Sequence, residues 1–127
     1  MTGLPYVALG GAIGASGRYL LGMALFKLKG PGFPWGTLSA NILGGLLMGL
    51  LVGWLALKVS GGEHLRLFLA VGVLGGFTTF SSFSLEALRM IETKHMAQAA
   101  GYIGSSVFFS ILAVFIGLWI ARKVFAL

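Results

Sequence analysis

The sequence contains no cysteine and no aspartate, and only 9% of its 127 residues are charged. Without cysteine, the chain can form neither disulfides nor thiolate sites. Its two histidines, His64 and His95, are expected in loops, so no metal-ligand cluster and no pair of nucleophile and base can be assembled. We therefore predict that the chain is not an enzyme.

The sequence also lacks any concentrated basic patch, although its formal net charge is +6. Its nine lysines and arginines occur in ones and twos along the chain. Nucleic-acid binding typically requires a basic surface interleaved with aromatic side chains. The pattern argues against a nucleic-acid partner and favours contacts between loop cations and lipid headgroups.

Apolar segments make up most of the sequence, which is 57% hydrophobic. Each approaches the ~20 residues that a transmembrane helix needs, and they lie at about residues 4–26, 35–57, 67–89 and 98–121. The first segment has no basic start and contains Arg18, unlike a signal peptide, so it is expected to remain as a helix. We predict a single domain over residues 1–127, an all-α integral membrane protein with four transmembrane helices.

The third apolar segment contains the run Gly75-Gly76-Phe77-Thr78-Thr79-Phe80-Ser81-Ser82-Phe83-Ser84, which is poor material for a continuous helix in lipid. Each unsatisfied backbone amide in hydrocarbon costs several kcal/mol, so irregular backbone persists only where protein or water shelters it. Transport proteins place ion sites at such interruptions. We predict that the third helix is broken and that a small ion binds there.

Phe80 and Phe83 lie beside several hydroxyl groups in this run. An aromatic ring has a positive edge, which can favour an anion without trapping it as a full positive charge would. Core packing is the competing interpretation of phenylalanines that recur every three residues. The neighbouring hydroxyls favour a functional role.

Two further sets of polar side chains each share a helix face. Thr37 and Asn41 are four residues apart in the second segment, and Tyr102, Ser106 and Ser110 recur every four residues in the last. Hydroxyls in a line can replace part of an ion's hydration shell. Ordinary interhelical hydrogen bonds for Asn41, and serine bonds to the serines' own helix, remain open alternatives.

Arg18 and Glu86 are ionisable residues inside apolar segments. Arg18 can either face an aqueous vestibule, where it would attract anions, or extend toward the headgroups. Glu86 can pair with Arg18 or with lysines, or it can mark the end of the third helix. Two rows of glycine at four-residue spacing allow close helix packing within one chain or between two copies; they are Gly10 and Gly14, and Gly45, Gly49 and Gly53.

Three blocks of this sequence resemble the Fluc-type (CrcB-type) fluoride channels of bacteria and archaea. They are residues 10–19, the stretch Gly36-Thr37-Leu38 followed by Asn41, and residues 75–84, and the likeness covers nearly the whole chain. Ser82 stands where the family often has threonine, which preserves the hydroxyl. The resemblance implies a passive channel that exports cytoplasmic fluoride across the inner (plasma) membrane, built as an antiparallel, dual-topology homodimer with two pores.

The resemblance also implies roles for individual residues. Phe80 and Phe83 would be the pore aromatics, near Thr79, while Tyr102 and Glu86 would lie at the pore ends. Backbone carbonyls of Gly75 and Thr78 from both subunits would hold a structural Na⁺. The residues that would offer hydrogen bonds to fluoride are Asn41, Ser106 and Ser110.

Two other functions are compatible with four short transmembrane helices. A small proton-coupled multidrug exporter needs a membrane-embedded carboxylate in its first helix, where this chain has Arg18 and no acid. A non-transporting membrane subunit has no need for a broken helix and two lines of polar residues. Both alternatives are therefore less favoured than a channel.

The loop charges predict the topology independently of the resemblance. With four spans, Lys58, Arg66, Arg122 and Lys123 share one side of the membrane. The other side holds an equal number of cations, so the rule that places positive loops in the cytoplasm gives almost no preference; these are Lys27, Lys29, Arg89 and Lys94. The chain is expected to insert in both orientations.

Overall fold

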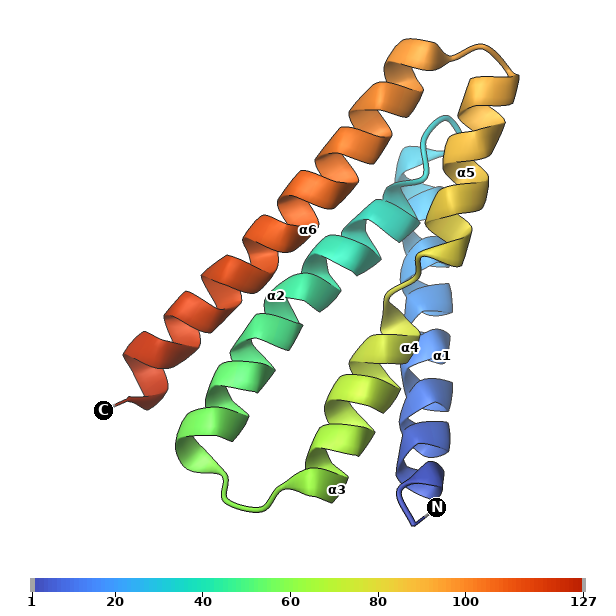
Figure 1. The fold of residues 1–127 in the computed structure, drawn as a ribbon. Helices are drawn as coiled ribbons and strands as arrows, with labels where there is room; N and C mark the ends of the chain where they lie inside the picture. Colours follow the sequence, from blue (N-terminus) through green and yellow to red (C-terminus); the bar gives the residue numbers. More distant parts are fainter. Residues whose placement is uncertain (1, 127) are drawn as a thin grey trace.

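The chain folds into helices joined by short loops, as seen in a computed structural model that describes residues 2–126. Figure 1 shows α3, η1 and α4 in line, and α5 following after an irregular linker. The third apolar segment is therefore broken, as predicted. In chain order the elements are α1 (Leu4–Lys29), α2 (Trp35–Lys58), α3 (Glu63–Arg66), the π-helix η1 (Leu67–Leu74), α4 (Gly75–Phe77), α5 (Ser81–Glu92) and α6 (Met96–Phe125).

Among the described residues, three helical stretches are long and apolar enough to cross a membrane: Trp35–Lys58, Glu63–Glu92 and Met96–Phe125. They leave large apolar side chains uncovered, such as Phe115 with 68% of its surface exposed. Such surfaces are suited to lipid rather than water. The chain is thus a multi-pass membrane protein. α1, with 26 residues, is similar in length but less apolar, because it carries Arg18 and several glycines.

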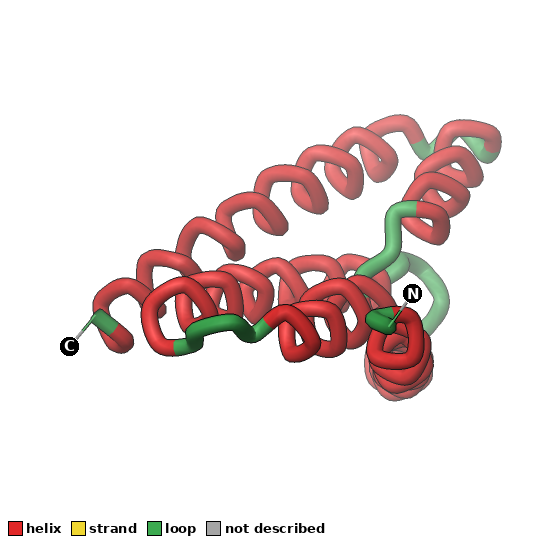
Figure 2. The backbone as a smooth tube through the Cα atoms, turned by 60° about the horizontal axis from the view of Figure 1, so that its bottom comes forward, coloured by secondary structure: helices red, strands yellow, loops and turns green. Residues whose placement is uncertain are grey.

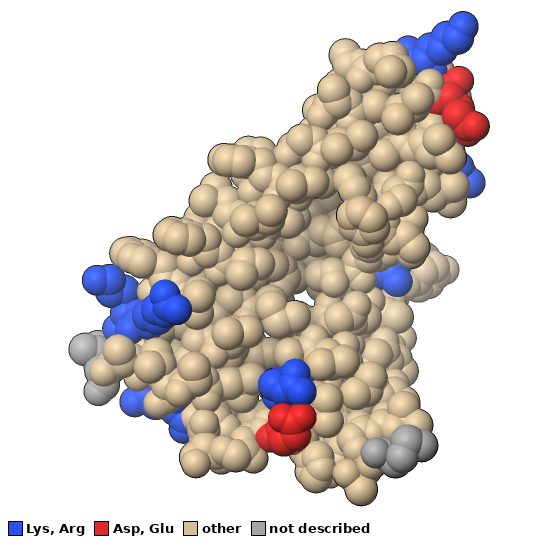
Figure 3. All heavy atoms as spheres, in the orientation of Figure 1, with Lys and Arg blue, Asp and Glu red and all other residues tan. Residues whose placement is uncertain are grey.

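The successive long helices alternate in direction, so the loops gather at two ends of the molecule (Figure 1). The N-terminus, the α2–α3 loop and the C-terminus lie toward one end, and the α1–α2 loop and the α5–α6 turn lie at the other. On the face drawn in Figure 3, most charged atoms lie toward these two ends. The arrangement agrees with the two groups of loop cations used to predict topology.

The glycine rows allow two close helix contacts within the chain. α2 and α6 run in the same direction, and a Cβ added at Gly117 would lie 2.9 Å from the amide nitrogen of Leu50. On the other side of the molecule α1 crosses η1, where a Cβ at Gly72 would lie 2.8 Å from the Cα of Gly10. Of the two interpretations left open by the sequence, packing within one chain accounts for both rows.

The break lets α5 leave the line of α4 and approach the start of α6. Figure 2 shows this linker as a loop between helices, with α5 displaced toward α6. Phe83 and Ala87 of α5 bury themselves there against Ala99 and Tyr102 of α6. The small buried core at this end therefore exists because the helix is interrupted.

Candidate functional site

The broken backbone is held by the side chain of Asn41 on α2. Its Nδ2 donates to the carbonyl oxygen of Thr79 at 3.0 Å, and its Oδ1 accepts from the amide nitrogen of Thr79 at 2.8 Å. One carboxamide thus satisfies both polar groups of a residue that has left the helix, where each unpaired group would cost about 1–3 kcal/mol. The structure gives Asn41 a definite backbone partner that the sequence did not reveal.

Neighbouring side chains satisfy other groups at the break. Both the amide nitrogen and the hydroxyl of Thr78 donate to the carbonyl oxygen of Leu74, each at 3.1 Å. The hydroxyl of Thr79 accepts from the amide nitrogen of Ser82 at 3.1 Å and so helps to start α5. These local bonds stabilise the end of α4 and the start of α5.

A groove of about 560 Å³ runs beside the break and brings together residues that are distant in sequence. It is mostly apolar, and within the described part of the chain no charged side chain lines it. Most of the predicted pore and cation-site residues lie on its wall, namely Asn41, Gly75, Thr78, Thr79, Phe80, Phe83, Ser106 and Ser110. The groove is therefore the candidate functional site.

Two serines on the α6 wall of this groove have unsatisfied hydroxyls. The Oγ atoms of Ser106 and Ser110 are buried, yet neither has a hydrogen-bond partner among the described residues. Serine in a helix commonly bonds to a carbonyl of its own preceding turn. Their neighbour on α6, Ser105, does so by donating to the carbonyl oxygen of Tyr102 at 3.4 Å. Buried polar atoms without partners are uncommon and point to a ligand or water in the groove.

The two predicted pore phenylalanines have very different surroundings. Phe80 is 76% exposed at the edge of the groove, whereas Phe83 is only 7% exposed and packs against α6. Their ring centres lie 5.4 Å apart, and Phe83 contacts Tyr102 at 5.2 Å. Phe83 is therefore part of the buried core of this chain, whereas Phe80 is not.

The row of aromatic rings continues beyond Tyr102 through two residues that the sequence did not mark as site residues. The ring of Phe33 meets that of Tyr102 edge-on at 5.3 Å, and Trp35 lies 4.7 Å from Phe33. Phe33 belongs to the loop before α2, and its sequence position carries no periodic signal. Only the fold brings it to Tyr102.

Glu86 lies beside this row at Tyr102 and accepts two hydrogen bonds. Tyr102 donates its hydroxyl to Oε1 at 2.9 Å, and Thr37 donates to Oε2 at 3.2 Å. Tyr102 is fully buried and does not line the groove itself. Thr37 shares a face with Asn41, as its spacing predicted, but the two bond to different partners.

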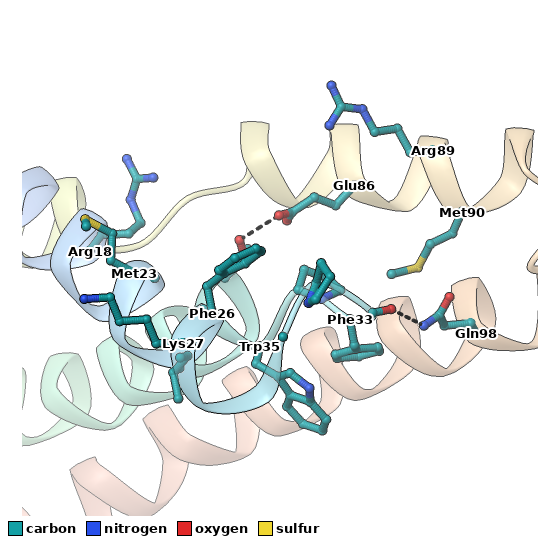
Figure 4. Close-up of a pocket in the computed structure, with 18 of the residues that line it drawn as sticks. Arg18, Met23, Phe26, Lys27, Phe33, Trp35, Glu86, Arg89, Met90 and Gln98 are labelled. Atoms are coloured by element: carbon teal, nitrogen blue, oxygen red, sulfur yellow. Dashed lines mark hydrogen bonds between the residues drawn. The ribbon is translucent and has the colours of Figure 1, made fainter.

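Glu86 and Arg18 both line a second cavity of about 800 Å³ at the end that holds the α1–α2 loop. Figure 4 shows the two side chains apart on the wall of this cavity, and no ion pair or hydrogen bond between them is found within residues 2–126. The Nε of Arg18 instead donates to the carbonyl oxygen of Gly76 at 3.4 Å. The sequence left Arg18 either facing an aqueous vestibule or extending toward the headgroups, and its place on the cavity wall favours the vestibule. Pairing of Arg18 with Glu86 is not observed among the described residues.

The histidines lie away from the groove. His95 precedes α6, and its Nδ1 lies 2.8 Å from the hydroxyl of Thr93. His64 lies within α3 rather than in a loop, and its ring stacks on Tyr6 with 4.4 Å between centres. The expectation that His64 would be a loop residue was therefore wrong, because the third helix begins before its apolar stretch.

We predict that Asn41→Leu destabilises the protein by exposing the unpaired peptide groups of Thr79. The expected cost is about 1–3 kcal/mol for each group. The melting temperature of the purified protein should fall, and amide hydrogen exchange should accelerate in residues 78–80. Leu43→Val, a change on the same helix at an exposed position, is the control. Unchanged exchange in this segment would show that Asn41 does not hold the break.

Comparison with known proteins agrees with this architecture. The family described as "CrcB-like protein, Camphor Resistance (CrcB)" matches residues 5–118. A protein of Hyphomonas neptunium named fluoride-specific ion channel FluC is 54% identical over 127 residues, covering 99% of this chain and 100% of the relative. Proteins of the same name from Caulobacter sp. (strain K31) and Agrobacterium fabrum are 54% and 50% identical, with 99% and 98% of this chain covered and 99% and 100% of the relatives. The chain therefore belongs to the CrcB-like family.

Proposed function

We propose that this protein is a passive channel that lets cytoplasmic fluoride leave the cell across the inner (plasma) membrane. Relatives that share about half of its residues over nearly the full length are named fluoride-specific ion channels. The observation that carries the proposal is the pair of buried, unpartnered hydroxyls of Ser106 and Ser110 in the groove beside Phe80 and Phe83. Hydroxyl donors without partners suit a small anion that accepts hydrogen bonds.

The groove has the weak, distributed polarity that conduction requires. An ion in a pore must bind well enough to lose water and weakly enough to leave. The serine hydroxyls and the edges of the phenylalanine rings each offer partial positive charge, and no lysine or arginine lines the groove to hold an anion tightly. The N-terminal end of α5 at the break adds a favourable dipole.

Arg18 and Glu86 would act in the cavity at the end that holds the α1–α2 loop rather than in the groove itself. The Arg18 guanidinium at the cavity wall would raise the local concentration of anions. Glu86, held by Tyr102 and Thr37, would lie where the row of aromatic rings meets the cavity. Fluoride would then pass from a vestibule lined by Arg18 toward the serines.

We further propose that α1 is a fourth transmembrane helix of the same single domain. Its 26 residues would extend about 39 Å, at 1.5 Å per residue, which is enough to cross the hydrocarbon core. It packs along η1, which belongs to a stretch apolar enough to span. Its glycine face is buried against η1, so this face does not contact lipid and does not need large apolar side chains.

A second, oppositely oriented copy would close the groove. Ile111 and Phe80 on the groove wall are 66% and 76% exposed beside polar hydroxyls, a surface poorly suited to lipid. Two such grooves in an antiparallel homodimer would give two pores. The balance of four loop cations against four would permit the two orientations.

A structural Na⁺ at the centre of this dimer would fit the carbonyls at the break. In a continuous helix the carbonyl of Gly75 would accept from the amide of Thr79, which here donates to Asn41 instead. The end of a half-helix with carbonyls freed in this way is a typical Na⁺ ligand set in transport proteins. Gly75 and Thr78 from each copy would hold the ion, which would supply fixed positive charge near the pores.

A proton-coupled exporter and an enzyme are both less compatible with these residues. α1 carries Arg18 and no carboxylate for proton exchange. No group of three or more histidine, cysteine, aspartate or glutamate side chains that could bind a metal occurs between residues 2 and 126. The homologues are named as channels, which perform no covalent chemistry.

We predict that liposomes containing the purified protein release fluoride without a proton gradient. Fluoride and chloride efflux are measured with ion-selective electrodes, with a proton ionophore present or absent. Fluoride should leave much faster than chloride under both conditions. The reason is that the hydroxyl donors of the groove can replace the water around a small anion but not around a larger one. Equal chloride efflux, or efflux abolished by the ionophore, would contradict the channel proposal.

We predict that Phe80→Ile and Phe83→Ile each reduce fluoride efflux by about tenfold or more, since the loss of about 1.4 kcal/mol of stabilisation along the path lowers a rate tenfold. Isoleucine keeps an apolar side chain but removes the polarised ring edge. Phe115→Ile on the exposed surface of α6, outside the groove, is the matched control and should conduct normally. Normal flux in both groove variants would mean that the rings serve only in packing.

We predict that both orientations of the chain occur in the membrane in comparable amounts. Because the chain has no cysteine, one cysteine introduced by Ala126→Cys reports the location of the C-terminal end by labelling with an impermeant maleimide. Labelling is compared before and after the inner face is made accessible. About half of the protein should react from each side; reaction from one side alone would rule out dual insertion.

A further inference from the structure

Three cations, Lys58, Arg122 and Lys123, lie where α2 and α6 end beside each other. The helices still touch near these ends, since a Cβ added at Gly53 would contact the side chain of Ala121. Lys58 follows Gly53 by about 7.5 Å of helix rise, and Arg122 and Lys123 follow Ala121 directly. Figure 3 shows lysine and arginine atoms gathered at this corner with no acidic atom among them. We call these three residues the C-terminal basic patch.

The patch has no acidic partner among residues 2–126. The ion pair found among these residues joins Arg66 to Glu63 at 2.9 Å and includes no patch residue. All three patch residues are exposed. Cations at helix C-termini partly offset the helix dipole, but two helix ends carry only about one negative charge together, at about half a charge each. Three cations therefore leave an excess of about two positive charges.

Tryptophan fixes the depth of this patch at the membrane surface. The ammonium group of Lys123 lies 5.8 Å from the ring centre of Trp119, which is 56% exposed. Trp54, half-buried near the end of α2, belongs to the same end of the molecule. Tryptophan is enriched where the hydrocarbon meets the headgroups, so the patch lies at the level of lipid phosphates.

We propose that the C-terminal basic patch is a binding site for the headgroup of an anionic phospholipid such as phosphatidylglycerol. Charge complementarity identifies the ligand, because basic clusters directly beside transmembrane helix ends attract anionic lipids by about fivefold for each nearby lysine or arginine. The phosphate would lie against the cations, and the acyl chains would follow the exposed apolar side of α6, where Phe115 lies. This site is separate from the groove and does not depend on which ion the protein conducts.

Quenching of Trp119 fluorescence by brominated lipids tests the proposal. Trp35→Phe and Trp54→Phe leave Trp119 as the single reporter. The full-length protein is reconstituted into vesicles in which either phosphatidylglycerol or phosphatidylcholine carries bromine. At low salt, phosphatidylglycerol should be enriched near Trp119 by about fivefold or more over phosphatidylcholine. The preference should weaken at about 1 M salt, where the screening length falls to about 3 Å.

Two triple variants in the same background separate this site from general membrane charge. The variant Lys58→Gln, Arg122→Gln, Lys123→Gln should lose the enrichment, whereas Lys27→Gln, Lys29→Gln, Lys94→Gln should retain it. Each triple variant leaves one loop cation on one side of the membrane and four on the other, so both change the charge balance that governs topology by the same amount. Equal quenching by the two lipids in the unmodified reporter, or enrichment that survives in the first variant, would overturn the proposal. So would displacement of phosphatidylglycerol by millimolar inorganic phosphate, since the patch would then bind free phosphate instead of lipid.

Discussion

The pair of hydrogen bonds between the Asn41 carboxamide and the Thr79 peptide is the interaction on which the rest of the site depends. A helix interrupted within a membrane leaves polar groups that lipid cannot satisfy. One asparagine on a neighbouring helix supplies a donor and an acceptor in the geometry that a peptide group requires. The interruption is therefore stable only where α2 passes beside it, which ties the position of the break to the packing of two helices.

Several consequences follow from that single constraint. Because Thr79 bonds to Asn41, the carbonyl of Gly75 loses its usual helical partner and the two half-helices present ends of opposite polarity. Because α5 is free to change direction, Phe83 can bury itself against Tyr102, and Tyr102 can donate to Glu86. The carbonyls, the ring edges and the hydroxyls thus come to surround one groove. The carbonyls and hydroxyls would be energetic liabilities in an unbroken span facing lipid, whereas in the proposed channel they would form a polar path beside the rings.

The sequence alone predicted the long helices and the break, because hydrophobic length and paired glycines are local signals. It also singled out Asn41, Ser106 and Ser110 as candidate site residues, since polar groups in apolar segments are conspicuous. It could not identify Thr79 as the partner of Asn41, nor bring Phe33 to Tyr102, because those contacts join residues that no periodicity relates. The glycine rows were ambiguous for the same reason, because four-residue spacing defines a helix face but not the helix that packs on it. In the structure, α6 packs on Gly49 and η1 packs on Gly10 within the same chain. The roles of individual groove residues in conduction, the Na⁺ and the dimer remain predictions.

The groove also connects the proposed function to the proposed assembly. An isolated copy in lipid would expose Phe80 together with the polar break, and it would leave the hydroxyls of Ser106 and Ser110 without partners. Lipid cannot hydrogen-bond these groups, and water would enter only if the groove were closed into a channel. A second copy of opposite orientation would provide that closure while bringing its own freed carbonyls to the same centre. The polar groups that make the single chain incomplete in a bilayer are thus the groups that an ion path needs, so selection for conduction and selection for pairing would act on the same surface.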